Sequence, residues 1–535
     1  MSTVLPKSDR RELGRRGRKK NRQQGSSKPK LAAADLIVGL ALETHRFGVT
    51  EKREPFAVAK DGPCVAVLLK EYAGDLKASL AAAFRRRHES VPSQAALANA
   101  ITVLQGEAQS GDVEDVFLRV AWHHGELVID IGDDTGRAVV VTPGIGWEVV
   151  GRAPVLFRRS SLTAPLPIPE RRGDLRDLRQ LINVSDKSWP IVVGWLLAAY
   201  IPDIPHPVLS LSGTQGTGKS CFAQTLLELF DPSTAPRGPE PRDPDRWHER
   251  AQNVWGVILD NLSGIRGWLS DLLCKSVTGD ASIRRRLYSN GDLVVSEIRN
   301  VVILTAIDTG ALRGDLGERL CRLELDPIPP TRRIDERQLK AIKNDVLPGV
   351  FGALLDALVK TLGRLPDIDL PTLPRMADFA KVLAAADEAG VTSEALGGFL
   401  GQQEEIGQDV LDSDPFGGAV KTFMQQRASW VGSASDLLDE MWPDRQLPRP
   451  REWPKAQGVS GALKRLIPQF KSDGIDIVFE RGGGKQRKRL IRITVVAESE
   501  PTSLQVSGVE SGELTTAPAF VGDPSLQPWD DDIPF

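Results

Sequence analysis

Apolar and polar residues follow different periods in different parts of the 535-residue chain. Between Val116 and Val150, short stretches alternate with period two and are separated by turn residues, which predicts a meander of strands. Residues 331–415 alternate Leu/Ala-rich helical stretches with proline and glycine breaks. The apolar runs Val257–Leu259 and Val301–Leu304, the second within the segment Arg299–Ile307, predict buried strands. The pattern therefore predicts a mixed α/β protein.

One loop between a predicted strand and a predicted helix has a phosphate-binding pattern. The segment "VLSLSGTQGTGKS" runs from Val208 to Ser220, and "CFAQTLLELF" continues with helical spacing, so GxxxxGK[ST] occurs in its required context. Glycines let backbone amides converge on phosphates. The lysine places a positive charge on the phosphates, and the serine hydroxyl binds Mg²⁺. The alternative is a Gly-rich turn that binds no nucleotide. We expect ATP and Mg²⁺ to be held by Gly213, Thr214, Gln215, Gly216, Thr217, Gly218, Lys219 and Ser220.

A P-loop also needs an acid at the end of a neighbouring apolar strand. In "NVWGVILDNLSG", Asp260 follows Val257–Leu259 and is expected to hold Mg²⁺ together with Ser220. The next apolar strand carries Thr305 at its carboxyl end, where a polar side chain is expected to position the attacking water. The residue after Asp260 is Asn261 rather than a second acid. The general base is therefore unassigned.

The order of these features resembles a known family. The chain resembles the superfamily 3 helicase type of AAA+ ATPase. The resemblance rests on the order of five features, namely the P-loop, the strand that ends in Asp, "VTGDASIRRRLYSNGD", the strand with a polar end, and "DLGERL". More closely, they resemble ATPases of phages and integrated mobile elements that are related to the helicase half of viral primase-helicases. The resemblance covers residues 170–330 and, less specifically, residues 50–495. It implies a hexameric ring that moves on single-stranded DNA.

The resemblance also implies roles for particular arginines. In the family, a hairpin enters the channel of the ring and grips DNA, and cations beside an aromatic ring suit phosphate contact and base stacking. A solvated surface hairpin is the alternative. Arg319 matches the family arginine near the subunit interface, which acts on the ATP of a neighbour. Thr305 stands where such proteins usually have Asn. The expected hairpin residues are Arg284, Arg285, Arg286 and Tyr288, before an Asn-Gly turn.

A second DNA-binding candidate lies near the C-terminus. Two helical stretches, "SASDLLDEM" and "QGVSGALKRLIPQF", precede "IDIVFERGGGKQRKRLIRITV", which reads as two strands around a basic turn. This order predicts a winged helix, and six Lys or Arg fall within Arg481–Arg492. The alternative is a protein-docking module with a solvated wing. The expected DNA contacts are Lys464 and Arg465 on the recognition helix and Lys485, Arg487, Lys488 and Arg489 in the wing.

Composition narrows the class of protein. Hydrophobic residues make up 41% and charged residues 26%, which is typical of globular domains. The four cysteines are far apart and lack Cys/His spacing, so neither a disulfide framework nor a zinc site is expected. We expect no apolar run long enough to cross a membrane and no signal peptide. A cytoplasmic protein without a membrane partner is therefore expected.

The net charge of −3 hides two oppositely charged ends. Residues 1–30 hold eleven Lys/Arg and two acids, whereas residues 498–535 hold eight acids and no Lys or Arg. The basic arm is either a solvated tail or a phosphate-binding arm. The tail ends in "DDDIPF", which resembles the acidic tip of bacterial single-stranded-DNA-binding proteins, and a solvated terminus is the alternative. The resemblance implies that host replication and repair proteins bind Asp530, Asp531, Asp532, Ile533, Pro534 and Phe535.

The expected architecture is an α/β multidomain chain. It has six segments, namely a disordered basic arm (1–30), an N-terminal α+β linking or collar domain (31–170), a P-loop ATPase core of AAA+/superfamily 3 type (171–330), a helical lid or connector (331–415), a winged-helix domain (416–497) and a disordered acidic tail (498–535).

The expected function is that of an ATP-dependent DNA motor, a hexameric replicative helicase of a phage or mobile element. Its partners would be single-stranded DNA, further copies of itself and the host proteins that bind the tip, with duplex origin DNA as an additional candidate. Two alternatives remain open. One is a DNA-binding initiator or regulator in which ATP controls assembly, and the other is a recruitment scaffold with a vestigial ATPase.

Overall fold

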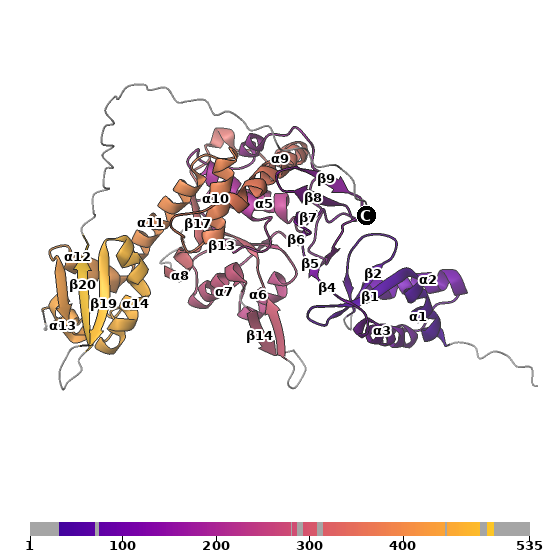
Figure 1. Cartoon of the computed structure of the whole chain (residues 1–535), viewed down its shortest axis with the longest axis horizontal. Helices are drawn as coiled ribbons and strands as arrows, with labels where there is room; N and C mark the ends of the chain where they lie inside the picture. Colours follow the sequence, from indigo (N-terminus) through magenta and orange to yellow (C-terminus); the bar gives the residue numbers. More distant parts are fainter. Residues whose placement is uncertain are drawn as a thin grey trace, which may run out of the picture.

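The computed structural model describes residues 32–69, 74–279, 281–285, 293–307, 314–444, 447–481 and 489–496. Within these ranges the chain is a mixed α/β protein, with an N-terminal unit at one end of the view and a C-terminal unit at the other (Figure 1). Between them lies a sheet surrounded by helices. The expected basic arm and acidic tail fall outside the described residues.

The N-terminal unit combines a four-stranded sheet with three helices. Strand β1 pairs antiparallel with β2 and parallel with β4, in the order β3-β2-β1-β4. Ile37 and Leu104 are buried in a cluster separate from the main core. Ser93 starts α3 by accepting a hydrogen bond from the backbone N–H of Ala96. The elements are α1 (Ala33–Thr44), β1 (His45–Thr50), β2 (Pro55–Ala59), β3 (Val67–Leu68), α2 (Gly74–His88), α3 (Gln94–Gln109) and β4 (Val113–Glu114).

The predicted meander forms an antiparallel sheet in the order β6-β7-β8-β9. Its residues alternate between two apolar clusters, because successive side chains of a strand point to opposite faces. Leu127 and Ile129 join the main core, whereas Val128 between them joins a smaller cluster. The strands are β6 (Val120–His123), β7 (Glu126–Asp130), β8 (Ala138–Thr142) and β9 (Gly146–Val150), with β5 (Val116–Phe117) and β10 (Leu156–Phe157) as a separate parallel pair.

This meander, which the sequence analysis placed in the N-terminal domain, shares its core with residues beyond 170. A buried ion pair joins the two parts. Arg119 Nε donates to Asp231 Oδ1 at 2.8 Å, and Arg119 Nη1 donates to the Asp130 carbonyl at 3.0 Å. The other carboxylate oxygen of Asp231 accepts from the backbone N–H groups of Trp255 and Gly256 at 2.8 and 2.7 Å. The meander is therefore anchored to the central sheet.

The central sheet has five parallel strands in the order β12-β13-β16-β11-β17. Every residue of β16 is buried, as expected of an inner strand covered on both faces. The antiparallel pair β14 and β15 is inserted between α7 and β16. The strands are β11 (Val208–Ser212), β12 (Arg237–Gly238), β13 (Gly256–Leu262), β14 (Ala281–Arg285), β15 (Leu293–Glu297), β16 (Val301–Ala306) and β17 (Leu320–Glu324).

Helices surround this sheet and continue beyond it. Helix α5 follows β11 directly and packs on β13 and β16. The helices are η1 (Leu175–Gln180), α4 (Trp189–Ala198), α5 (Lys219–Phe230), α6 (Pro244–Ala251), α7 (Gly267–Thr278), α8 (Gly314–Gly317), η2 (Pro330–Arg332), α9 (Glu336–Arg364), η3 (Leu365–Asp367), α10 (Ala377–Glu388) and α11 (Ala395–Ser413).

Helix α9 corrects one expectation from the sequence. In the described part of the chain, Glu336–Asp367 is the one helix long and apolar enough to cross a membrane. However, 67% of its most apolar stretch is buried inside the protein. Leu354 and Leu358 lie in the main core, and a Cβ added at Gly352 would lie 1.7 Å from the carbonyl oxygen of Glu170. The helix therefore packs as a core helix.

The C-terminal unit runs helix, strand, helix, helix, strand, strand, with the sheet order β18-β20-β19. Ser433 and Asp436 form a capping box that starts α13. Gln469 Nε2 donates to Glu318 Oε1 at 3.2 Å, and the buried residues of α14 continue the main core. The elements are α12 (Pro415–Met424), β18 (Ser429–Gly432), α13 (Ala434–Met441), α14 (Ala456–Ser472), β19 (Ile475–Arg481) and β20 (Arg489–Val495).

Candidate functional site

The loop between β11 and α5 has a backbone that only glycines adopt easily. Gly213, Gly216 and Gly218 have φ angles of 137°, 80° and 83°. At Gly213 a Cβ would also lie 2.6 Å from the carbonyl oxygen of Leu325. Gly218 is the N-cap of α5 and offers no side chain to the first backbone N–H groups. Those donors are thus directed at the space in front of the helix, where an anion is favoured.

Lys219 folds back into this loop. Its Nζ donates to the carbonyl oxygens of Gly213 and Thr214 at 2.6 and 2.8 Å, and it lies 3.4 Å from Thr217 Oγ1. Burial lowers the pKa of the Lys219 ammonium, and the charge of Asp260 acts in the opposite direction. The three contacts hold a cation beside the positive end of α5. Phosphate oxygens are stronger partners for such a cation than carbonyl groups.

The expected Mg²⁺ ligands lie together. Ser220 Oγ in the first turn of α5 donates to Asp260 Oδ1 on β13 at 2.8 Å. Hydroxyl and carboxylate oxygens are the ligands that Mg²⁺ prefers, usually along with phosphate oxygens and water. The pair lies at the carboxyl ends of β11 and β13, next to the glycine loop. Ser220 and Asp260 therefore fit the ion that the sequence analysis assigned to them.

Thr305 lies near the carboxyl end of β16 and contacts Asp260. Its hydroxyl donates to Asp260 Oδ1 at 2.5 Å and accepts from the backbone N–H of Asn261 at 2.8 Å. Thr305 is only 1% exposed. Because a hydroxyl has a single proton, Thr305 has none left to donate to water while it holds Asp260. In this arrangement Thr305 orients Asp260, and a contact between Thr305 and the attacking water stays a prediction.

Asn261 has a conformation that fits its residue type. It lies in the left-handed region, with φ at 59°, next to an irregularity of the β13–β16 pairing. Asn adopts this region more readily than most residues that have a side chain. The local bulge turns the Asn261 N–H toward Thr305. The residue after the Mg²⁺ aspartate therefore contributes its backbone to the site rather than an acid.

Arg319 lies at the opposite end of the sheet, immediately before β17. Its Nη1 donates to the carbonyl and the Oδ1 of Asp315 at 2.7 and 2.5 Å. The residue is 8% exposed, and its Nε has no hydrogen-bond partner among the described residues. Although burial opposes it, the bond from Arg319 lowers the pKa of Asp315. Arg319 is therefore too far along the strand to reach the nucleotide loop of its own chain.

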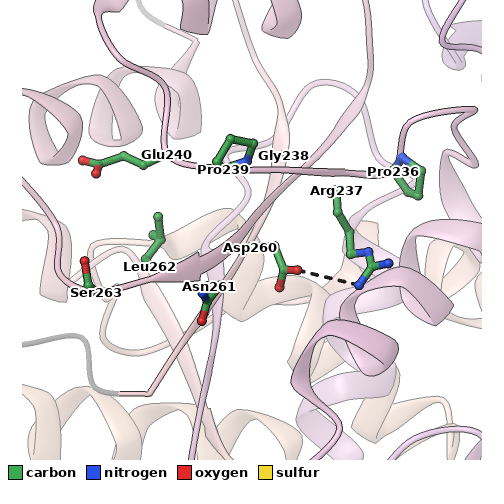
Figure 2. Close-up of a pocket in the computed structure, with 9 residues that line it drawn as sticks. All are labelled: Pro236, Arg237, Gly238, Pro239, Glu240, Asp260, Asn261, Leu262 and Ser263. Atoms are coloured by element: carbon green, nitrogen blue, oxygen red, sulfur yellow. Dashed lines mark ion pairs between the residues drawn. The ribbon is translucent and has the colours of Figure 1, made fainter. Parts of the chain in front are cut away.

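Sequence reasoning missed a cavity beside Asp260. The cavity has a volume of about 690 Å³ and is lined by residues 236–240 and 260–263. Figure 2 shows Arg237 on β12 directed at Asp260, with Arg237 Nη1 3.8 Å from Asp260 Oδ2. The stretch "PRGPEP" gave no signal, because a two-residue strand between prolines shows no periodicity. Asp260 thus has the glycine loop on one side and this cavity on the other.

Two further polar residues missed by sequence reasoning contact the loop. Asn183 Nδ2 donates to the carbonyl oxygens of Thr217 and Asp326 at 3.2 and 2.6 Å. A Cβ added at Gly216 would lie 3.2 Å from Arg333 Nη2, so this guanidinium lies against the loop. Neither residue belongs to a short motif, and the chain must fold before they meet the loop.

The DNA-binding candidates are only partly described. The backbone pairing places Arg284 opposite Val294 and Arg285 opposite Leu293 in the predicted hairpin. On α14, Lys464 and Arg465 are exposed, as is Arg489 at the start of β20. The other predicted contacts lie outside the described residues, namely Arg286, Tyr288, Lys485, Arg487, Lys488, and the tip residues Asp530, Asp531, Asp532, Ile533, Pro534 and Phe535.

Comparison with known families identifies the part of the chain that holds this site. Residues 175–407 match the actinomycete integrative conjugative element replication protein. Residues 416–508 match the C-terminal domain of the RepA protein of the same elements. Over these two ranges the chain is similar to a replication protein of a mobile element. The expected link to a mobile element is confirmed, while the superfamily 3 assignment stays a prediction. No curated protein matches the chain.

Solved structures resemble the chain only distantly. The apo structure of the NrS-1 C-terminal region (305–718) is 13% identical, covers 88% of this chain and 100% of its own, and has a TM-score of 0.36. The A form of that region has a TM-score of 0.38 at the same identity and coverage. The JCV helicase is 13% identical over 41% of this chain and 60% of its own, with a TM-score of 0.24. At such scores the likeness supports no functional conclusion.

Proposed function

We propose that this chain is an ATP-dependent DNA motor, the replicative helicase of an integrative element, which acts as a hexamer and couples ATP hydrolysis to movement along single-stranded DNA. One observation carries the proposal. Lys219, Ser220 and Asp260 converge at the carboxyl ends of parallel strands, with Ser220 Oγ 2.8 Å from Asp260 Oδ1. Ligands of open α/β sheets bind at this edge. The match to a mobile-element replication protein agrees with it.

The residues of the site have distinct tasks in this proposal. Lys219 exchanges its bonds to the Gly213 and Thr214 carbonyls for bonds to phosphate oxygens. Ser220 and Asp260 hold Mg²⁺, which neutralises phosphate charge when bound. Thr305 keeps Asp260 in one orientation through its 2.5 Å bond. Much of the polar framework is therefore positioned before the substrate arrives, which is how catalytic sites reduce reorganisation.

Cations on two elements would contact DNA. The β14–β15 hairpin would carry Arg284, Arg285, Arg286 and Tyr288 to the strand, as in the family that the sequence resembles. We infer that the C-terminal unit is a winged helix, because its element order and the sheet order β18-β20-β19 place α14 before two adjacent strands. Exposed Lys464 and Arg465 on α14 would then contact duplex origin DNA.

The hexamer is supported by the resemblance, and Arg319 would act on the ATP of a neighbouring subunit. In the single chain Arg319 is bound to Asp315 at 2.5 Å. Association of subunits would therefore have to redirect this side chain. A monomer is accordingly expected to be a poor ATPase.

The tail residues Asp530–Phe535 would bind host replication and repair proteins. Aspartates would steer the encounter, and the terminal Phe would enter an apolar pocket with a basic rim. Deleting Phe535 should abolish capture of such proteins in a pull-down, whereas an unchanged pull-down would refute this assignment.

A second candidate function is favoured by Asn261 and Thr305. Neither supplies an acid, and Thr305 is occupied with Asp260. Slow hydrolysis would suit an initiator in which bound ATP controls assembly on duplex DNA. The recruitment scaffold with a vestigial ATPase differs from both, because it predicts no turnover even with DNA.

The deciding experiment compares wild type with Lys219→Ala in steady-state ATP hydrolysis, with and without single-stranded DNA. DNA should stimulate the wild type, and the substitution should reduce turnover roughly 100-fold or more, because a cation that stabilises transition-state charge is lost. Lys187→Ala is the matched control, since Lys187 is exposed and its pair with Glu405 is 4.0 Å long.

Three outcomes separate the candidates. Stimulation that vanishes only in Lys219→Ala supports the motor. ATP binding without DNA-dependent turnover contradicts the motor, and sequence-specific duplex binding would then favour the initiator. Equal nucleotide binding by wild type and Lys219→Ala would contradict an ATP site at this loop.

A further inference from the structure

The site described so far has no group to take a proton from the attacking water. Asn261 follows Asp260 where a second acid is common, and it contributes its backbone N–H to Thr305. Asp260 Oδ1 already accepts hydrogen bonds from Ser220 and Thr305, and Asp260 is the carboxylate assigned to the metal ion in the proposed site. A base must therefore come from another element.

Strand β12 brings one more carboxylate to this edge of the sheet. β12 runs parallel to β13, with Gly238 opposite Leu259. Glu240 and Asn261 each come two residues after this pair, where β12 and β13 are no longer paired. Glu240 also lines the 690 Å³ cavity that Asp260 borders. Apart from Asp260, it is the one acid among the residues that line this cavity.

The surroundings of Glu240 leave one oxygen without a hydrogen bond. Its side chain is 22% exposed, and Arg266 Nε lies 3.3 Å from Oε1. The alignment of this ion pair gives no hydrogen bond, so Oε1 is a buried oxygen without a hydrogen-bond partner in the described ranges. Leaving a buried acceptor unsatisfied lowers stability, and such groups call for an explanation beyond stability. A base that must accept a proton provides one.

Arg266 is the ion-pair partner of Glu240, with its Nε 3.3 Å from Oε1. A carboxylate that acts as a general base accepts the proton on one of its oxygens. Figure 2 shows the Glu240 carboxyl directed away from Asp260. Rotation about the side-chain bonds of Glu240 is needed to bring it across the cavity. Arg266 is 64% exposed, so it offers little steric hindrance to that rotation.

We propose that Glu240 is the general base of ATP hydrolysis, supplied by β12 in place of the acid missing after Asp260. The proposal rests on the ATPase function proposed above. The water oxygen forms a bond to the γ-phosphorus while the bond from the γ-phosphorus to the bridging oxygen breaks. One proton of the water passes to Glu240, and ADP leaves with the electron pair of the broken bond. Glu240 then releases the proton to solvent, which restores the carboxylate and gives ADP, phosphate and one proton.

The test compares wild type, Glu240→Gln and Glu249→Gln. Glu249 is the matched control, because it is an exposed glutamate on α6 paired with Arg246 at 2.8 Å. Single-turnover hydrolysis of ATP is measured on the full chain with Mg²⁺ and single-stranded DNA. Binding of a fluorescent ATP analogue and the thermal unfolding midpoint are measured in parallel. Glu240→Gln should lower the hydrolysis rate roughly 100-fold or more, with analogue binding and the unfolding midpoint close to wild type.

A second variant separates a catalytic role from a structural one. Glu240→Ala should lose hydrolysis in the same way, and added formate should restore part of it, because a small carboxylate can occupy the space of the missing side chain. Formate should not increase hydrolysis by wild type or by Lys219→Ala. A contact that only supports the fold would show no such rescue.

The outcomes also separate the assignment of Glu240 as the base from the proposed ATPase function on which it rests. Hydrolysis by Glu240→Gln at the wild-type rate overturns the base assignment and leaves the ATPase intact. Loss of analogue binding or of the folded state together with hydrolysis, with no rescue by formate, also overturns it, since Glu240 would then be structural. If the wild type neither binds the analogue nor turns over ATP, both proposals fail.

Discussion

The strands of the central sheet carry polar side chains at both their amino ends and their carboxyl ends, here called the amino edge and the carboxyl edge, but the two sets differ in their partners and in their exposure. At the amino edge, Asp231 accepts from Arg119 and two backbone N–H groups, and all of these are buried. Asn300, immediately before β16, is fully buried and donates to two backbone carbonyls at 2.9 and 2.8 Å. These groups gain their partners when the chain folds, so they contribute to stability.

At the carboxyl edge, side chains that border the cavity are more exposed and have longer contacts. Arg237 is 50% exposed and lies 3.8 Å from Asp260, and Glu240 keeps one oxygen without a hydrogen bond in the described structure. Lys219 contacts neutral oxygens that a phosphate would replace. Such contacts are weak enough to be exchanged for those of a substrate. Incomplete pairing alone does not mark such a site, because Asn300 Oδ1, Arg319 Nε and His206 Nδ1 at the amino edge also have no partner among the described residues. The difference teaches that polar residues at a strand end indicate chemistry where they border an accessible cavity.

The strongest test of this comparison is to replace one aspartate with alanine at each edge. Asp231→Ala should lower the free energy of unfolding by about 3–5 kcal/mol, because Arg119 would be left buried without its partner. Asp260→Ala should leave stability close to wild type and lower ATP hydrolysis by roughly 100-fold or more. Urea unfolding followed by tryptophan fluorescence and steady-state ATP hydrolysis measure the two effects.

Asp186→Ala provides the control for both measurements. The Asp186 side chain is 92% exposed and pairs only with Arg179 in the described residues, so its loss should matter little. If Asp260→Ala destabilised the protein as strongly as Asp231→Ala, the distinction between the two edges would be wrong.

At the carboxyl edge, sequence patterns predicted the site residues that lie close together along the chain and missed those that do not. The phosphate loop needs several glycines within a few residues, so its spacing is visible in the sequence, and the structure gives these glycines positive φ angles. Strand β12 has two residues between prolines and shows no periodicity, so Arg237 and Glu240 were missed. Their relevance arises only from parallel pairing with β13.

In other parts of the fold, the sequence did not predict which residues contact one another in the interior. Alternation predicted the meander, but not that Leu127 and Val128 would enter two different cores. Thr305 was correctly placed at a strand end, yet its hydroxyl is occupied by Asp260 and Asn261. Pairings of this kind join residues that lie far apart along the chain, and a local pattern carries no information about them.

A smaller effect concerns the amino edge alone. There, the free energy of unfolding should depend on pH through His206. His206 is fully buried before β11, and its Nε2 lies 3.0 Å from the carbonyl oxygens of Ala198 and Ile201. Since carbonyls only accept, Nε2 carries the proton of the neutral ring. Burial lowers the pKa of His206 from 6.5 to about 4, against the opposing effect of these two bonds. Protonation would place a charge at Nδ1, which has no partner among the described residues.

The sign of the pH effect follows from this shift. The unfolded chain takes up a proton near pH 6.5 and the folded chain only near pH 4, so the contribution of His206 is complete above pH 6.5 and is lost as pH falls toward 4. The free energy of unfolding should fall by about 2 kcal/mol between pH 7.5 and 5 on account of His206. His206→Phe removes the titration, so urea unfolding of this variant should show a shallower pH slope than wild type. Equal slopes would mean that His206 is already protonated, or accessible to water, in the folded protein.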